Sequence, residues 1–270
     1  MSVPLLVGIL FAHSGHPHSV VDVGRIAVVT GGSRGIGAAT SLVLAVKGWD
    51  VAVCYLKDRE AADSVAGECR SLGRRALALQ ADVSSESDIV SLFTSVDKEL
   101  GPLGTLVNSA GIVDQKARVD EYPSGRVERM FAVNVVGSFL CAREAVRRMS
   151  TSHGGTGGSI VNISSAASRL GSPGEYVDYA ASKGAIDTMT LGLAREVASE
   201  GIRVNAVRPG LVHTTIHASG GQPDRLERLA GAVPMGRAGQ PDEIASTIAW
   251  LCSDEASYVT GAIVDVSGGR

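Results

Sequence analysis

The sequence predicts a single α/β domain, a doubly wound parallel sheet of seven strands with helices on both faces. Two observations predict it. Short apolar, β-branched runs alternate with longer helix-forming segments along most of the 270 residues. A glycine-rich turn joins the first apolar run to the first helical segment, as in sheets built from strand–helix–strand units. No internal repeat divides the chain, so residues 24–270 are expected to form one domain.

Composition narrows the class of protein and its partners. Hydrophobic residues make up 44% of the chain, enough for one large packed core. The formal net charge is −3 and no basic run is present, which argues against nucleic acid as a partner. His213 and His217 have no third ligand nearby, so no metal site is predicted. The cysteines form no C-x-x-C pair and are interpreted as buried, reduced thiols of a cytoplasmic protein: Cys54, Cys69, Cys141 and Cys252.

Residues 1–23 precede the first predicted strand. Residues 4–12 are apolar but too few to span a bilayer. No Lys or Arg precedes them, as a signal peptide requires. We therefore expect residues 1–23 to be a disordered or dispensable extension and expect no membrane partner. A weak membrane or export segment is the alternative.

The secondary-structure elements follow one another with short connections. Strands are predicted at residues 25–30, 50–55, 76–80, 105–108, 160–163, 203–207 and 262–266. Helices are predicted at residues 38–47, 59–72, 87–100, 126–149, 179–199 and 241–252. Residues 211–240 contain scattered Gly and Pro and no sustained strand. A connection of that length is unusual and suggests a lid over a substrate.

The glycine-rich turn has the sequence TGGSRGIG at residues 30–37. Gly31 permits a tight turn, while Gly35 and Gly37 allow the backbone to approach a ligand and the helix to pack on the strand. The N–H groups at the following helix N-terminus favour an anion. The context of strand, turn and helix therefore predicts a Rossmann-type site for the pyrophosphate of a dinucleotide.

The end of the second predicted strand bears on the choice between NAD and NADP. An acidic residue that binds the ribose 2′-hydroxyl of NAD is expected there, but the position is Tyr55. Arg34 and Lys57 could instead pair with a 2′-phosphate. The sequence therefore favours NADP, with a simple surface ion pair of Arg34 as the alternative. Asp82 ends the third strand and is expected to border the adenine.

The segment Tyr179-Ala180-Ala181-Ser182-Lys183 places a phenol and an ammonium one helical turn apart. The positive charge is expected to lower the Tyr179 pKa, which suits proton transfer to or from a substrate oxygen. The spacing alone is weak evidence, because such pairs usually have no function. Asn134 lies among apolar residues and is either a satisfied core amide or a site residue.

Taken together, these segments resemble the short-chain dehydrogenase/reductase family from about residue 25 to residue 269. The resemblance rests on TGGSRGIG at 30–37, Asp82, NSAG at 108–111, Asn134, ISS at 163–165, YAASK at 179–183 and RPG at 208–210. It implies an NAD(P)-binding Rossmann-fold catalytic domain that transfers a hydride between a nicotinamide and a carbonyl or alcohol. It also implies a small-molecule substrate and a homo-oligomer, a tetramer or a dimer.

The resemblance assigns roles to individual residues. It implies that Tyr179 is the acid/base, that Lys183 lowers its pKa and holds the nicotinamide ribose, and that Ser165 hydrogen-bonds the substrate oxygen. It implies that Asn134 holds a water of the proton relay. The residues that it places at the cofactor are Gly31, Ser33, Arg34, Gly35, Ile36, Gly37, Tyr55, Asp82, Val83, Asn108, Ala110, Gly111, Tyr179, Lys183, Pro209, Gly210, Val212 and Thr214.

Three positions depart from the family pattern. Ser109 replaces a usual Asn, with little expected loss. Thirteen residues separate Ser165 from Tyr179, one more than is usual, so Ser164 is an alternative to Ser165. Arg208 stands where a small polar residue is common and could bind an anionic substrate or form a salt bridge.

The predicted function is that of an NADP-preferring oxidoreductase acting on a small carbonyl or secondary alcohol. Within this class, 3-oxoacyl reduction on an acyl carrier protein and sugar or polyol oxidation are both candidates. An acidic carrier protein would need a basic surface, for which Arg143, Arg147 and Arg148 are candidates, although residues 150–159 contain no Lys or Arg. The alternatives outside this class are a non-catalytic dinucleotide-binding regulator and a lyase or epimerase that uses the cofactor transiently.

Overall fold

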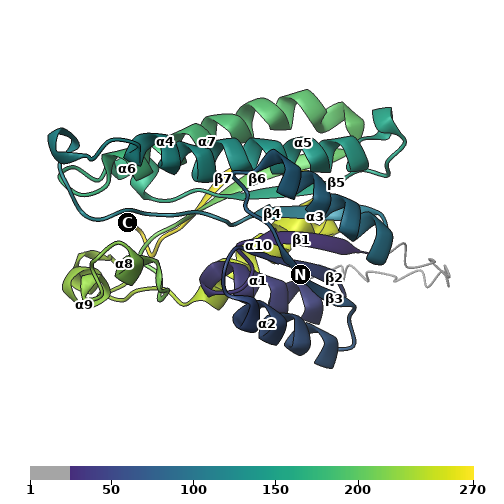
Figure 1. Ribbon diagram of the computed structural model, residues 1–270, viewed down its shortest axis with the longest axis horizontal. Helices are drawn as coiled ribbons and strands as arrows, with labels where there is room; N and C mark the ends of the chain where they lie inside the picture. Colours follow the sequence, from purple (N-terminus) through teal and green to yellow (C-terminus); the bar gives the residue numbers. More distant parts are fainter. Residues whose placement is uncertain (1–24) are drawn as a thin grey trace, which may run out of the picture.

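The computed structural model describes residues 25–270, so the prediction for residues 1–23 lies outside the described residues. Seven parallel strands form one sheet in the order β3-β2-β1-β4-β5-β6-β7 (Figure 1). The strands are β1 (Ile26–Thr30), β2 (Asp50–Tyr55), β3 (Ala76–Gln80), β4 (Leu103–Asn108), β5 (Gly158–Ile163), β6 (Ile202–Pro209) and β7 (Ile263–Val266). The order reverses between β1 and β4, which confirms the predicted doubly wound parallel sheet.

Helices cover both faces of the sheet (Figure 1). One face carries α1 (Gly35–Val46), α2 (Arg59–Ser71) and α10 (Pro241–Cys252). The other carries α3 (Glu86–Glu99), α4 (Arg126–Phe131), α5 (Gly137–Met149) and α7 (Val177–Val197). The short helices α6 (Ala167–Leu170), α8 (Ile216–Ser219) and α9 (Arg225–Leu229) follow the carboxyl ends of β5 and β6.

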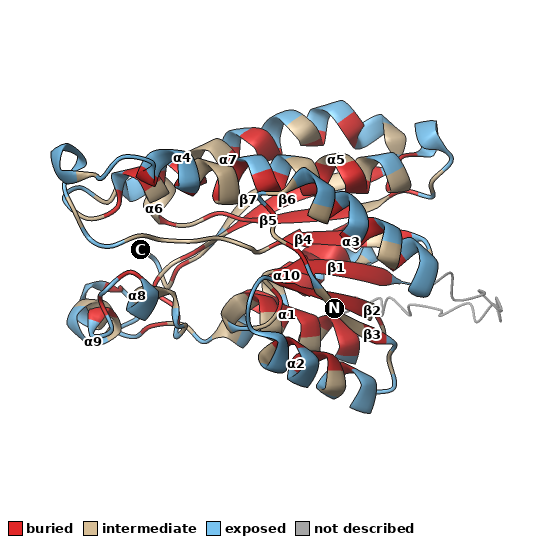
Figure 2. Ribbon diagram, in the orientation of Figure 1, coloured by how far each residue is buried: buried red, intermediate tan, exposed pale blue. Residues whose placement is uncertain are grey.

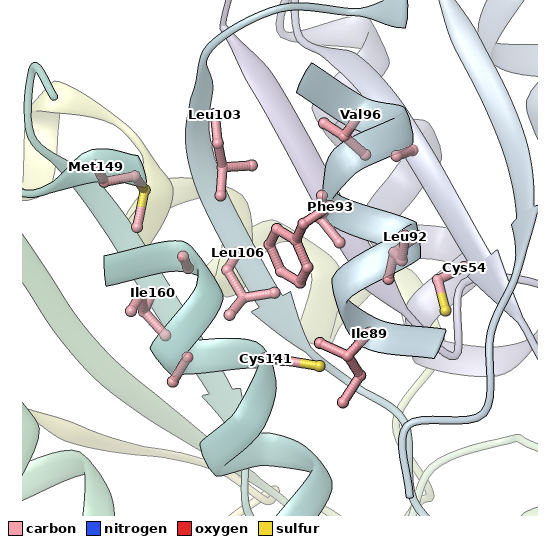
Figure 3. Close-up of a cluster of buried hydrophobic side chains, with 14 of the residues drawn as sticks. Cys54, Ile89, Leu92, Phe93, Val96, Leu103, Leu106, Cys141, Met149 and Ile160 are labelled. Carbon is pink, nitrogen blue, oxygen red and sulfur yellow. The ribbon is translucent and has the colours of Figure 1, made fainter. Parts of the chain in front are cut away.

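The central strands are buried because each face of the sheet packs on helices, whereas β3 and β7 at the sheet edges are mostly half-buried (Figure 2). All five residues of β1 are buried, which explains its continuous apolar run. Figure 3 shows one of the two main clusters, in which Phe93 of α3 packs with Leu106 of β4 and Ile160 of β5. Apolar contacts of this kind fix the positions of the strand ends.

The predicted boundaries agree closely with the structure for most elements, and β2, β3 and α10 coincide with their predicted ranges. The predicted single helix over residues 126–149 is not uniform, because a π-helical segment, η2 (Ala132–Val136), separates α4 from α5. The predicted lid at residues 211–240 contains α8, α9 and the 3-10 turn η5 (Ala230–Ala232), and it contains no named strand. Within residues 25–270, no helix combines the length and hydropathy needed to cross a bilayer.

Candidate active site

A cavity of about 640 Å³ lies at the carboxyl ends of the strands, beside the point where the strand order reverses. Ligands of doubly wound sheets bind at this edge. All but two of the predicted site residues line it: Gly31, Ser33, Arg34, Gly35, Ile36, Gly37, Tyr55, Asp82, Val83, Ala110, Gly111, Ser165, Tyr179, Lys183, Pro209, Gly210, Val212 and Thr214. The exceptions are Asn108 and Asn134.

The glycine turn forms one wall of this cavity with its backbone. Gly31 has a φ of +62°, a conformation that strains other residues, and a Cβ there would lie 2.9 Å from Ala110 Cα. A Cβ on Gly37 would lie 2.2 Å from the Gly31 carbonyl oxygen. The turn therefore needs glycine in order to pack against the loop that follows β4.

The N-terminus of α1 opens onto the same wall. The side chain of its N-cap residue, Arg34, makes no hydrogen bond to the first turn of the helix, and no acidic residue lies in that turn. The first N–H groups of a helix have no partner within the helix. Since Gly35, Ile36 and Gly37 line the cavity, an anion bound there would satisfy these donors and the helix dipole. The residues present fit the pyrophosphate of a dinucleotide.

The end of the cavity next to β2 and β3 carries the groups relevant to the adenosine. Tyr55 is buried and lines the cavity, so no carboxylate occupies the end of β2. Arg34 and Lys57 line the cavity and are exposed, and neither makes a salt bridge within residues 25–270. Asp82 accepts hydrogen bonds at Oδ1 from the Ser84 N–H at 2.9 Å and the Ser84 hydroxyl at 2.7 Å. This end therefore offers two exposed cations to a phosphate.

Lys183 of α7 is buried, and its Nζ donates a hydrogen bond to the Ile163 carbonyl oxygen at 2.7 Å. Burial lowers the Lys183 pKa to about 8, and the negative charge of Asp187 opposes that shift. A Cβ on Gly111 would lie 3.6 Å from Lys183 Nζ, so the loop after β4 passes close to the ammonium.

Tyr179 lines the cavity one helical turn before Lys183. Burial raises the Tyr179 pKa above its ordinary value, although the Ser165 side chain and the charge of Arg225 act in the opposite direction. This net direction is opposite to the predicted one. The physical reason is that desolvation of a buried phenolate outweighs its stabilisation, while Lys183 Nζ lies 5.7 Å from the centroid of the Tyr179 ring.

The two serines after β5 have different surroundings. Ser164 is buried, and its hydroxyl donates to the Lys183 carbonyl oxygen at 3.2 Å. The Ser165 Oγ accepts a hydrogen bond from the Ala167 N–H at 3.1 Å, and its side chain acts on the Tyr179 phenol. Because its O–H can still donate, Ser165 is better placed than Ser164 to hold a substrate oxygen.

Asn134 lies in the π-helical segment and is almost fully buried. Its Oδ1 accepts from the Ile112 N–H at 2.8 Å, and its Nδ2 donates to the Ile112 carbonyl at 3.0 Å and to the Ser182 hydroxyl at 3.1 Å. Both atoms of the amide are thus hydrogen-bonded within the protein, and the water-binding role implied for Asn134 stays a prediction. The side chain fixes the loop after β4 against α7 behind the cavity wall. Insertions of this π type frequently accompany functional sites.

Asn108 also lies behind the cavity. Its Nδ2 donates to Asn162 Oδ1 at 3.0 Å, and Asn162 Nδ2 donates to the Thr190 hydroxyl at 2.9 Å. These bonds connect β4, β5 and α7, so Asn108 holds the elements that carry the site.

The other candidate residues make protein contacts. Arg208 does not line the cavity, and its Nη2 lies 2.9 Å from Asp187 Oδ2, so the salt-bridge alternative holds. The predicted basic helix face is neutralised by three carboxylates. Arg143, Arg147 and Arg148 all pair with Glu144. Arg143 also pairs with Glu86, and Arg148 with Asp97. The four cysteines are buried and unpaired. No three His, Cys, Asp or Glu side chains within residues 25–270 are grouped to hold a metal ion.

Four further residues line the cavity, and no sequence pattern indicated them: Tyr176, His217, Arg225 and Arg270. With Ser165 and Tyr179 they make up the part that we call the substrate end. Tyr176 precedes Tyr179 by three positions, and its hydroxyl donates to the Gly220 carbonyl of the lid at 3.1 Å. His217 and Arg225 belong to the short helices of the lid. No periodic pattern in residues 211–240 indicated which side chains face inward.

Comparison with known proteins agrees with this arrangement. Residues 31–270 match the family described as enoyl-(acyl carrier protein) reductase. The chain is 55% identical over 245 residues to the Escherichia coli oxidoreductase YgfF, described as uncharacterized, covering 91% of this chain and 99% of the relative. The chain belongs to the short-chain dehydrogenase/reductase family. It is therefore an oxidoreductase acting on alcohol or carbonyl groups, in a family that generally binds NAD(P)(H).

Two further relatives of this dehydrogenase/reductase are informative. It is 40% identical over 245 residues to a cis-4-hydroxycyclohexanecarboxylate dehydrogenase of Sinomonas cyclohexanicum, covering 91% of this chain and 96% of the relative. A crystal structure of a short-chain type dehydrogenase/reductase from Mycobacterium marinum superimposes with a TM-score of 0.85 at 32% identity, over 92% of this chain and 96% of the other. The fold is thus shared over nearly the whole of both chains.

Proposed function

We propose that this protein is an NADP(H)-preferring oxidoreductase for a small ketone or secondary alcohol, with Tyr179 as the acid/base. The observation that carries the proposal is one cavity that is lined both by the uncapped N-terminus of α1 and by Ser165, Tyr179 and Lys183. When bound, the nicotinamide supplies or accepts the hydride.

The chain's own residues handle the oxygen and its proton. The Ser165 hydroxyl donates to the substrate oxygen and stabilises the negative charge that develops there. Tyr179 keeps its proton at Oη because its pKa is raised, and it delivers that proton to the same oxygen. In the direction of oxidation, Tyr179 needs a nearby positive charge to accept the proton. Lys183 is the buried ammonium beside it and also holds the nicotinamide ribose.

The preference for NADP(H) rests on the adenosine end. Tyr55 leaves that end without the carboxylate that binds a ribose 2′-hydroxyl, and Arg34 and Lys57 offer positive charge. A 2′-phosphate supplies the anion that these side chains lack.

The carrier-protein alternative receives little support. Arg143, Arg147 and Arg148 are paired with acidic side chains, and the end of α5 lies at the amino end of β5 rather than at the cavity. Oxidation of a sugar or polyol remains compatible with the same site.

We also propose that the protein forms a homo-oligomer through the face that carries α4, α5 and α7. Large apolar side chains are exposed on these helices and on η2 between α4 and α5: Val127, Val136, Phe139 and Leu191. Light scattering on the purified protein tests this proposal, which a monomer at micromolar concentration contradicts.

The deciding experiment follows oxidation of NADPH and of NADH with a panel of cyclic ketones, α-diketones, keto-sugars, aldehydes and 3-oxoacyl thioesters. We expect turnover of at least one class, faster with NADPH, and none with Tyr179→Phe. Binding of NADPH is measured in parallel by calorimetry. Tight NADPH binding without turnover of any class would instead favour the non-catalytic regulator.

A further inference from the structure

The substrate end of the cavity holds a buried cation that the chemistry above does not use. Arg225 begins α9 in the lid, lines the cavity and is only 8% exposed. Its guanidinium lies over the Tyr176 ring, 5.2 Å from the ring centroid. The guanidinium thus lies against an aromatic ring, and a buried guanidinium requires partners for its N–H donors.

Glu175 does not balance the positive charge around it. Glu175 Oε2 lies 2.6 Å from Arg225 Nη1, so the two side chains form a close ion pair. Lys116 also shares Glu175, with its Nζ 3.8 Å from Oε1. One carboxylate thus faces two cations, which leaves an excess of positive charge at this part of the cavity wall.

A further cation lies nearby. Arg270 lines the same cavity, and the positive charge of Arg225 adds to burial in lowering the Arg270 pKa. The negative charge of Glu175 opposes this effect but acts less strongly, so the two guanidiniums that line the cavity retain a net repulsion. His217 also lines the cavity, and burial together with the Arg225 charge lowers its pKa, which favours the neutral imidazole. An anion placed here relieves the repulsion.

Arg225 and Tyr179 line the same cavity, and the charge of Arg225 acts against the burial that raises the Tyr179 pKa. The elements proposed to bind the phosphates, the α1 N-terminus and Arg34, line the same cavity but make no salt bridge with Glu175. The rest of the substrate end is largely apolar, with Leu170, Leu211 and Ile216 among its residues. A compact apolar body that carries a carbonyl and one carboxylate matches this lining.

We propose that the substrate carries a carboxylate and that Arg225, supported by Arg270, binds it. This inference rests on the proposed function and adds the substrate class. A guanidinium matches a carboxylate because its N–H groups can donate in parallel to both oxygens. Glu175 occupies the guanidinium when no substrate is present and gives way to the substrate carboxylate.

The test compares keto acids with neutral amides of the same shape. The pairs are 4-acetylbenzoate with 4-acetylbenzamide and levulinate with levulinamide, each reduced with NADPH. For the wild type we expect kcat/KM to favour the acid of at least one pair by tenfold or more, since a charge-assisted hydrogen bond contributes about 10- to 100-fold. Equal use of acid and amide in both pairs overturns the inference.

Substitutions test whether the preference for the acid depends on Arg225. Arg225→Met should raise KM for the acid about 10- to 100-fold and leave KM for the amide nearly unchanged. Arg225→Lys should retain part of the preference, and Glu175→Gln should strengthen it by removing the competing carboxylate. Arg228→Met is the matched control, because Arg228 lies on the same helix and does not line the cavity. If Arg225→Met lowers kcat/KM equally for the acid and the amide, Arg225 has a structural role only and the inference is wrong.

A binding measurement separates this inference from the proposed function. Calorimetry of the protein saturated with NADP⁺ should detect benzoate but not benzamide, and Arg225→Met should abolish the difference. If no ketone is reduced while benzoate still binds through Arg225, the oxidoreductase proposal fails and the anion site stands. If neutral ketones are reduced and benzoate does not bind, the anion site fails alone. If Arg225→Met weakens NADPH binding instead, Arg225 serves the cofactor and the inference is wrong.

Discussion

The ammonium of Lys183 donates to the carbonyl oxygen of Ile163, the last residue of β5, over 2.7 Å. The bond joins the catalytic helix to the sheet at the point where the cavity begins. It also holds a cation in a buried position, and burial lowers the Lys183 pKa from 10.5 to about 8. The consequence is a stability that depends on pH.

The direction of this pH dependence follows from the number of protons that the folded and unfolded states bind. Between pH 8 and pH 10.5 the unfolded chain keeps the Lys183 proton and the folded protein has lost it, so unfolding takes up a proton. The free energy of unfolding contributed by Lys183 should therefore rise over this range, by roughly 1–3 kcal/mol. Urea unfolding of the wild type and of Lys183→Met at both pH values measures it. If the difference in unfolding free energy between the wild type and Lys183→Met is the same at both pH values, the lowered pKa of Lys183 is contradicted.

Tyr179→Phe removes the phenolic hydroxyl and little else. Because proton transfer by a positioned side chain contributes about 10²–10⁴-fold, turnover should fall at least that much. Binding of NADPH should change by less than about threefold, since the α1 N-terminus and Arg34 are intact. Ser165→Ala should slow turnover less than Tyr179→Phe, because one hydrogen-bond donor is lost. Full activity of Tyr179→Phe would remove Tyr179 from the mechanism.

Arg34→Ala tests whether Arg34 binds the 2′-phosphate of NADPH. Loss of a charge-assisted hydrogen bond should weaken NADPH about tenfold or more and leave NADH nearly unchanged. Lys57→Ala is the companion variant, with a smaller expected effect because an ammonium is a point charge without the guanidinium fork. Equal weakening of both nucleotides by Arg34→Ala shows that Arg34 does not discriminate between them.

Gly37→Ala tests the close packing of the glycine turn. The added Cβ would meet the Gly31 carbonyl oxygen at 2.2 Å, so the turn must shift. We expect a loss of about 1–3 kcal/mol in unfolding free energy, with weaker dinucleotide binding. Gly192→Ala in α7 is the control, because a Cβ there meets nothing within 4 Å and alanine favours a helix by about 0.5–1 kcal/mol.

The buried ion pair between Arg126 and Asp178 predicts sensitivity to acid. Arg126 Nε donates to Asp178 Oδ2 at 2.8 Å, and both residues are almost fully buried. Burial alone raises the Asp178 pKa, but the hydrogen bonds and charge of Arg126 outweigh it and hold the pKa below 3.8. The stability that this pair contributes is therefore fully present above the pKa of Asp178 in the unfolded chain. It is lost as pH falls through the lower pKa of Asp178 in the folded protein.

Arg126→Met should cost about 3–5 kcal/mol at neutral pH because it leaves Asp178 buried without a partner. The double variant with Asp178→Asn should recover part of that loss. Denaturant unfolding at about pH 7 and about pH 3 measures both effects. The penalty of Arg126→Met should be smaller at the lower pH, and a penalty that grows there contradicts the pKa direction.

The sequence was most informative where a local pattern and the global fold coincide. The strands are short apolar runs because both faces of the sheet are covered, so β2 and β3 could be bounded from the sequence alone. The glycine turn was predictable because Gly31 and Gly37 have a steric requirement that few other contexts impose.

The remaining features depend on contacts between distant segments. The pKa of Tyr179 depends on its burial in the fold, and Arg208 pairs with Asp187 from another element, so neither could be inferred from neighbouring residues. The Asn134 side chain in the π-helical turn binds Ile112 of the loop after β4, a contact that the local sequence does not indicate. Arg225 could not be placed because residues 211–240 show no periodicity.

The two ends of the cavity come from different stretches of the chain. The proposed phosphate-binding backbone and adenosine end lie within residues 31–84, whereas the proposed substrate end draws mainly on residues 165–225 and on Arg270. The lid serves both ends, because Val212 and Thr214 are assigned to the cofactor while Arg225 lies at the proposed substrate end. A graft from a relative that aims at a new substrate should therefore replace residues 215–240 and keep Val212 and Thr214, so that the nucleotide site is retained.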